Sequence, residues 1–225
     1  MESKLQEAYD PQKFKQVGHE LIDLITDYLE DAELGKIPVN NFEDPQKQLE
    51  YWKNYELANK PPVTLFKDII DRSIHVHHPK YMGHQISPAA PISALASLVS
   101  SILNNGMAIY EMGSAASAIE KVVIDKITQK IGYGDNADGF LTSGGTIGNL
   151  TALLAARQAV SNTDIWEDGI EENFGVMVCE EAHYSVDRAL RIMGFGTKGI
   201  IKIPAGENFT MRTDLLDGYY REAEQ

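Results

Sequence analysis

The sequence predicts an α/β fold in which a mostly parallel sheet is flanked by helices and preceded by a helical N-terminal segment. In the second half of the chain, the apolar runs "FGVMVCE" (174–180) and "KGIIKIP" (198–204) enclose a stretch of helical periodicity that begins near Ser185. Strands that alternate with helices are typical of βαβ units with parallel strands. Ligands of such sheets bind beyond the carboxyl ends of the strands, so we expect a functional site there.

The first part of the chain is predicted to be helical, with a connecting arm. Asp10 before Pro11 is typical of an N-cap followed by the first helical position. One apolar stripe then recurs at helical spacing, formed by Leu21, Leu24, Ile25, Tyr28 and Leu29. Residues 35–62 carry four of the nine prolines, and we expect them to form the arm, with a short helix over 49–57.

Two more helices are predicted from Pro91 onward, one ending at "NNG" (104–106) and one ending at Gly132. The run "GFLTS" (139–143) is expected to be a strand that leads into a helix from about Thr146. That makes about three strands, fewer than the five or six of a typical sheet. We therefore expect an incomplete domain over 91–225, truncated at its C-terminal end, after an N-terminal segment over 1–90.

Charge and composition exclude several classes of partner. The formal net charge of -13 argues against nucleic acid, because phosphate backbones are bound by clustered Lys and Arg. The single cysteine, Cys179, lies in an apolar run and is interpreted as a buried core thiol. No run reaches membrane-spanning length, and the N-terminus has no apolar core like that of a signal peptide. We expect a cytoplasmic protein that has neither a membrane nor a nucleic-acid partner.

The segment "FLTSGGTIGNLTALLAAR" (140–157) places Ser143, Gly144, Gly145 and Thr146 where an apolar run becomes a helix. The first turn of a helix has free N–H groups and a partial positive charge, so it stabilises an anion. Glycine permits close approach of a phosphate, and hydroxyl groups add donors. The segment matches neither the Walker loop nor the dinucleotide fingerprint. Taken alone, it favours a structural cap over a phosphate site.

His183 lies in "VCEEAHYSVDRAL", a few residues after a predicted strand and just before a helix. It is interpreted either as a hydrogen-bonded residue at the helix start or as part of a ligand site. A right-handed βαβ connection brings the end of this strand near the Gly-Gly turn. An imidazole beside a phosphate site suits a planar, phosphorylated aromatic ligand.

Four motifs in order carry a resemblance to a known family: "HPKYMGHQIS" (78–87), "IYEMGSAASAIEKVVID" (109–125), "GFLTSGGTIGNLTALLAAR" (139–157) and "EEAHYSVDRALRIMGF" (180–195). Together they resemble the group II pyridoxal-phosphate-dependent amino-acid decarboxylases, which include glutamate, aromatic amino-acid and diaminobutyrate decarboxylases. The resemblance runs from about Phe66 to Pro204. It implies an aminotransferase-like fold type I domain over 91–225, incomplete, with pyridoxal 5'-phosphate as cofactor.

The resemblance also implies roles for single residues. Gly145 and Thr146 would bind the cofactor phosphate, Ser143 and Gly144 would shape the turn, and His183 would stack on the pyridine ring. Asn149 matches a family position with a structural role. In the first motif, His78 would lie at the active-site entrance, and His84 and Gln85 would be substrate-binding residues. Their polar character favours a polar or acidic L-amino acid as substrate.

Two family motifs that should follow the matched segment are absent after it: the Asp-x-Ala strand, and the His-Lys pair that supplies the Schiff-base lysine. Lys198 and Lys202 match neither motif and are interpreted as solvated. The resemblance thus covers the N-terminal half of a decarboxylase, expected to be inactive alone. The alternative is a truncated or degenerate homologue that binds cofactor or dimerises without turnover.

The family resemblance also implies a homodimer, with the 10–30 helix wrapped onto its partner. The single apolar stripe of that helix is equally compatible with packing on its own domain.

A zinc site is a further alternative, because His75 and His77 of "HVHHP" would share one side of a strand. No Cys or carboxylate follows at a recognisable ligand spacing, so the expected metal content is none. The segment "HELID" (19–23) lacks the second histidine of a metalloprotease helix.

Overall fold

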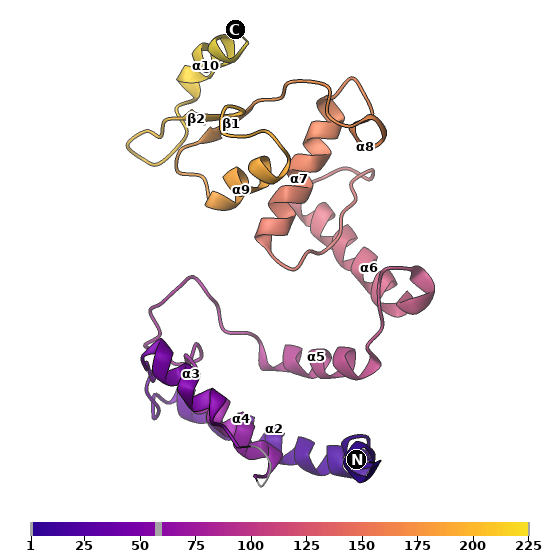
Figure 1. Cartoon of the computed structure of the whole chain (residues 1–225), viewed down its shortest axis with the longest axis vertical. Coiled ribbons are helices and arrows are strands. Elements are labelled where there is room, and N and C mark those ends of the chain that lie inside the picture. Colours follow the sequence, from indigo (N-terminus) through magenta and orange to yellow (C-terminus); the bar gives the residue numbers. More distant parts are fainter. Residues whose placement is uncertain (1, 57–59, 225) are drawn as a thin grey trace. The chain divides into compact units, whose positions relative to one another are not determined.

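The computed structural model describes residues 2–56 and 60–224, which belong to two compact units, Met1–Leu103 and Asn104–Gln225 (Figure 1). Helix α5 (Pro91–Leu103), which we expected at the start of the larger domain, belongs to the first unit. The domain boundary expected after residue 90 stays a prediction.

The described part of the first unit is built from helices. Besides α5, these are α1 (Glu2–Ala8), α2 (Pro11–Glu33), α3 (Pro45–Lys53) and α4 (Pro62–Asp71). Helix α2 begins as predicted, because the Asp10 carboxylate accepts a hydrogen bond from the Gln12 N–H at 2.9 Å. Helices α2 and α4 pack against each other.

The short helix expected over 49–57 is displaced toward the N-terminus. Helix α3 begins four residues earlier, at Pro45, because Asp44 caps it by accepting the Gln46 N–H at 2.9 Å. It ends at Lys53, and Leu57 lies outside the described residues. The Asp-Pro pair at 44–45 carries the same signal as the pair at 10–11 and would have placed this boundary.

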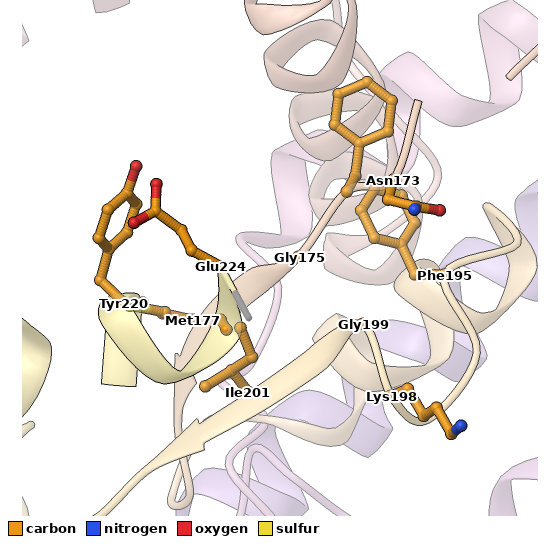
Figure 2. Close-up of a pocket in the computed structure, with 11 residues that line it drawn as sticks. Asn173, Gly175, Met177, Phe195, Lys198, Gly199, Ile201, Tyr220 and Glu224 are labelled. Carbon is orange, nitrogen blue, oxygen red and sulfur yellow. The ribbon is translucent and has the colours of Figure 1, made fainter. Parts of the chain in front are cut away.

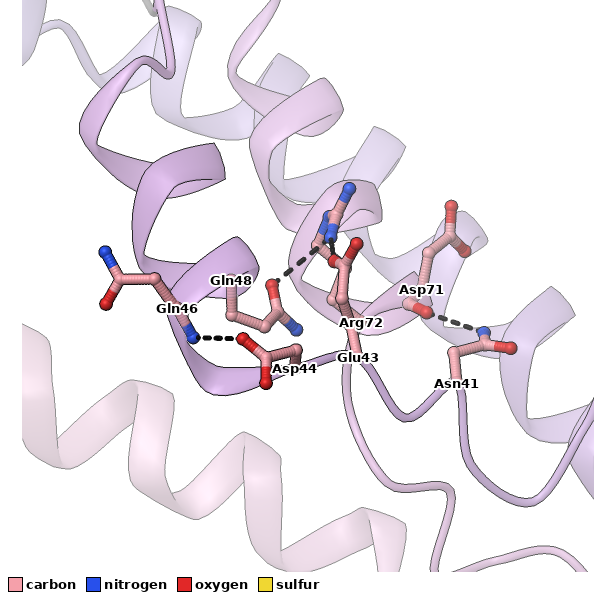
Figure 3. A network of polar contacts seen from close by, with 7 residues as sticks. All are labelled: Asn41, Glu43, Asp44, Gln46, Gln48, Asp71 and Arg72. Carbon is pink, nitrogen blue, oxygen red and sulfur yellow. Dashed lines mark hydrogen bonds and ion pairs between the residues drawn. The ribbon is translucent and has the colours of Figure 1, made fainter.

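Arg72, just after α4, ties the segment before α3 to α4 (Figure 3). Its guanidinium contacts Glu43 at 2.6 Å and Gln48 at 3.2 Å, and it lies 3.4 Å from the centre of the Tyr51 ring. Asn41 adds a hydrogen bond to the carbonyl of Asp71 at 2.7 Å. These contacts hold the arm against α4 mainly through one partly buried cation.

The second unit contains the sheet, and its described elements alternate as the sequence predicts. They are η1 (Tyr110–Met112), α6 (Ser114–Ile131), α7 (Gly145–Val160), α8 (Ile165–Asp168), β1 (Val176–Cys179), α9 (Tyr184–Ile192), β2 (Ile200–Ile203), η2 (Thr213–Leu215) and α10 (Leu216–Ala223). Strands β1 and β2 pair in parallel, with Val176 opposite Ile200 and Cys179 opposite Ile203. The predicted βαβ unit is confirmed.

The strand expected at Gly139–Ser143 is wrong. These residues have no strand partner in the described chain, where the one sheet is the β1–β2 pair. The Leu141 N–H instead donates to the Glu120 carboxylate of α6 at 2.8 Å. The segment has an apolar strand-like composition, but a strand forms only where a neighbouring strand supplies the other half of the ladder.

The core of the second unit lies between β1, β2 and α9. Leu190 of α9 and Ile203 of β2 are fully buried, and Val178 of β1 and Ala189 of α9 are buried as well. Ser185 of α9 is also fully buried, although it is polar. A buried hydroxyl requires hydrogen-bond partners, and these partners lie at the candidate site.

Within the described residues, no helix combines the length and the apolar character that crossing a bilayer requires.

Candidate functional site

The turn at 143–146 opens α7 in a conformation that suits glycine. Gly144 is the N-cap, with φ 154° and ψ 161°, a combination that a side chain makes unfavourable. Its carbonyl accepts hydrogen bonds from the N–H groups of Ile147 (3.1 Å) and Gly148 (3.2 Å). No side chain in the described chain caps this helix. The N–H groups of Gly145 and Thr146 are therefore those that an external acceptor can use.

The space in front of this turn is open. A Cβ atom built on Gly144 or Gly145 would meet no atom within 4 Å, and Ser143, Gly144 and Gly145 are exposed. Free N–H groups, the positive end of a sixteen-residue helix and adjacent hydroxyls are the donor set that binds phosphate. The residues present fit a phosphate group.

His183 lies at the carboxyl side of β1, as predicted, and is the N-cap of α9. Its Nδ1 accepts a hydrogen bond from the Ser185 N–H at 3.3 Å and lies 2.8 Å from the Ser185 hydroxyl. The ring itself is exposed, and its centre lies 4.3 Å from that of Tyr184. His183 therefore caps a helix and still presents an imidazole to a ligand.

The structure brings the turn and the histidine into one packed arrangement, because α7 and α9 are in contact (Figure 1). Asn149, one turn into α7, donates from Nδ2 to the Ser185 hydroxyl at 2.8 Å. Toward the other end, Arg157 of α7 donates to the carbonyl of Met193, which follows α9, at 3.4 Å. The helix that begins with the 143–146 turn and the helix that His183 caps are thus joined at two points.

Ser185 is a residue of the candidate site that the sequence did not predict. Its only local signal is its place two residues after His183, where a hydroxyl can reach the capping side chain. Its contact with Asn149 joins residues 36 positions apart and follows from the packing of α7 on α9.

The two lysines near the sheet occupy different places. Lys202 of β2 forms an ion pair with Asp187 of α9 at 2.6 Å, and its side chain is exposed. Lys198 lines a separate hollow of about 720 Å³ (Figure 2). Gly175 and Gly199, each directly before a strand, line the same hollow, so it lies at the end where β1 and β2 begin. His183 follows the opposite end of β1, which is the end where parallel sheets bind ligands.

The three residues that the first motif places at the site lie in the first unit. His78 is buried, and its Nδ1 accepts the Lys80 N–H at 3.0 Å. His84 and Gln85 are exposed, and the carbonyl of His84 accepts a hydrogen bond from the Tyr81 hydroxyl at 3.2 Å. His84 and Gln85 are therefore free to contact a ligand, whereas the buried His78 supports the local turn.

The strand that the zinc alternative required does not form. His75 directly follows an isolated bridge between Asn40 and Ile74 and packs against the Tyr28 ring, 5.4 Å between centres, and His77 lies in the turn that comes next. In the part of the chain that the structure describes, no three His, Cys, Asp or Glu side chains are placed to hold a metal ion.

Curated relatives are similar to about two thirds or more of the chain. A diaminobutyrate decarboxylase of Acinetobacter baumannii is 33% identical over 162 residues, which are 66% of this chain and 32% of the relative. An aromatic-L-amino-acid decarboxylase of Bacillus atrophaeus is 28% identical over 94% of this chain and 43% of its own length. The chain thus spans less than half the length of these relatives.

Solved structures share the fold. A glutamate decarboxylase domain from Vibrio parahaemolyticus superposes with a TM-score of 0.83 at 22% identity, over 94% of this chain and 48% of that chain. A tryptophan decarboxylase of Catharanthus roseus, solved with L-tryptophan, gives 0.79 at 18% identity over 96% and 47%. These neighbours confirm the incomplete fold type I architecture.

The conserved domain of pyridoxal-dependent decarboxylases matches residues 63–225, a span that includes the 143–146 turn and His183. This family uses pyridoxal 5'-phosphate. With the open N-terminus of α7, the capping imidazole of α9 and the shared fold, the match leads to one conclusion: the chain belongs to the pyridoxal-dependent decarboxylase family.

Proposed function

We propose that this chain supplies the phosphate-binding and ring-covering part of a carboxy-lyase that converts an L-amino acid to an amine and CO2. The observation that carries the proposal is the open, uncapped N-terminus of α7 beside the helix that His183 caps. Both lie within the span that matches the family domain. The relatives named above act, by their names, on diaminobutyrate and on aromatic amino acids.

The chain's own residues would hold the cofactor at two places. The N–H groups of Gly145 and Thr146, with the Thr146 hydroxyl, would bind the phosphate. The partial positive charge at the N-terminus of α7 would stabilise the negative charge of the phosphate. His183 would cover one face of the pyridine ring and exclude water from it. When bound, pyridoxal 5'-phosphate supplies a ring that accepts the electron pair left at Cα as CO2 departs.

The substrate proposed is a polar or acidic L-amino acid. His84 and Gln85 support it, because both are polar and exposed in the structure. His78 is proposed to shape the entrance, since its buried ring accepts a backbone hydrogen bond and orders the turn that follows.

The working form proposed is a homodimer. Apolar side chains of α5 support it: Ile92 is 73% exposed and Ile102 is 64% exposed. Exposed apolar surface of this kind is typical of surfaces that associate.

The test is release of labelled CO2 from carboxyl-labelled L-amino acids by the native protein that contains this chain, sized by sedimentation in the same buffer. We expect CO2 from a polar or acidic substrate, a dimer, and a His183→Ala variant at least tenfold slower. The control His19→Ala alters an exposed histidine of α2 and is expected to be unchanged. Cofactor binding without CO2 from L-2,4-diaminobutyrate or from any of the twenty amino acids would favour the non-catalytic homologue.

A further inference from the structure

We propose that Asn149 and Ser185 are positioning residues, which hold the His183 ring in place with Nδ1 as a hydrogen-bond acceptor, so that the neutral ring carries its proton on Nε2. The inference rests on the proposed function, in which His183 covers the cofactor ring. Three groups from two helices form the chain of contacts: the Asn149 amide, the Ser185 hydroxyl and the His183 imidazole, with 2.8 Å at each step.

The direction of each hydrogen bond follows from the donors available. The Ser185 backbone N–H can only donate, and it points at His183 Nδ1, so Nδ1 carries a lone pair rather than a proton. The Ser185 hydroxyl accepts from the Asn149 amide nitrogen, which leaves its own hydrogen to point at Nδ1. A neutral imidazole has one proton, so that proton lies on Nε2.

Burial makes this arrangement specific. Ser185 is fully buried and Asn149 is partly buried, so an unpaired hydroxyl or amide here would lose its water without replacement. His183 is the exposed end of the chain of contacts. The buried part is satisfied by the protein itself, and the ring of His183 is the exposed part.

The contacts also set the position of one helix relative to the other. Asn149 is on α7, whose first turn is the phosphate site, and Ser185 is on α9, which His183 caps. One hydrogen bond therefore relates the phosphate-binding turn to the ring that covers the cofactor. A substitution at Asn149 is expected to change the hydrogen bonding of the His183 ring, although the two residues belong to different helices.

The test is NMR of the chain with ¹⁵N-labelled histidine rings at pH 8, without cofactor, with His183 assigned by His183→Gln. We expect an unprotonated Nδ1 and a protonated Nε2. Asn149→Asp keeps the shape but replaces the donor by an acceptor, which turns the Ser185 hydroxyl away from the ring. In that variant the Ser185 N–H remains the donor to Nδ1, so we expect the proton to stay on Nε2 while the Nδ1 resonance shifts toward that of an unprotonated nitrogen that has lost its hydroxyl donor. Thr151→Val is the control, since the Thr151 hydroxyl, on the same helix, donates to the Ile147 carbonyl.

A second readout is the dissociation constant of pyridoxal 5'-phosphate. Ser185→Ala is expected to weaken binding about threefold to tenfold, the range that one buried hydrogen bond accounts for, and Ser185→Thr to restore it. A wild-type His183 with its proton on Nδ1, or ring shifts that Asn149→Asp leaves unchanged, would overturn the inference. Because the shifts are measured without cofactor, a chain that fails to bind cofactor refutes the proposed function and leaves this test intact.

Discussion

His75 is a buried imidazole, 3% exposed, whose two ring nitrogens lack a hydrogen-bond partner in the described structure. Burial lowers its pKa below the ordinary value, an effect that His78 reinforces and that the carboxylate of Asp71 opposes. Its ring packs on Tyr28 of α2. The folded first unit therefore holds this histidine in its neutral form.

This burial predicts how stability depends on pH. Below about pH 6.5 the unfolded chain binds a proton at His75 that the folded chain does not, so the free energy of unfolding falls as the pH is lowered toward the folded pKa. Denaturant titrations at pH 7.5 and 5.5 measure the fall. In His75→Leu we expect a smaller fall over the same interval. An equal fall in both proteins would show that other groups cause it.

Gly132 ends helix α6 as its C-cap, with φ 92° in the left-handed region. A Cβ atom built on Gly132 would meet no atom within 4 Å. Gly132→Ala is expected to lower the free energy of unfolding by about 1 kcal/mol, through backbone strain alone. Chemical denaturation of the second unit measures it.

Gly218, inside α10 of the same unit, provides the matched control, because its Cβ would also meet no atom. Gly218→Ala is expected to raise the free energy of unfolding by a few tenths to about 1 kcal/mol. A loss of stability in both variants would mean that the left-handed turn at Gly132 is not the cause.

Helices α2 and α6 and the segment 139–143 show which structural features the local sequence predicts and which it does not. The start of α2 at Asp10-Pro11 and the end of α6 at Gly132 depend on caps that neighbouring residues supply, so both were predictable. The segment 139–143 has the composition of a strand, yet a strand depends on a partner far away in the sequence. The N–H of Leu141 in this segment donates to the Glu120 carboxylate instead, and no local sequence pattern predicts this contact.

In the molecule as a whole, the candidate site also combines features that neighbouring residues determine with features that depend on packing. The glycines and hydroxyls at 143–146 and the position of His183 after β1 are local signals, and the sequence locates them correctly relative to α7 and α9. The contact from Asn149 to Ser185 arises only when the two helices pack. Ser185 therefore had to be found in the structure.

The N-terminus of α7 is proposed to be a phosphate site and not only a turn. Two substitutions separate these roles. Gly145→Asp and Ser114→Asp each place a carboxylate at the first residue of a helix that has a glycine N-cap and no side-chain cap. Each is expected to stabilise its helix by about 0.3–1 kcal/mol, since a negative charge suits the helix N-terminus.

The deciding measurement is equilibrium dialysis of pyridoxal 5'-phosphate against the native protein that contains this chain, at constant ionic strength. We predict that Gly145→Asp weakens binding at least tenfold, because its carboxylate repels the phosphate, while Ser114→Asp binds like the unmodified protein. Equal affinity of Gly145→Asp and the unmodified protein would contradict the phosphate site.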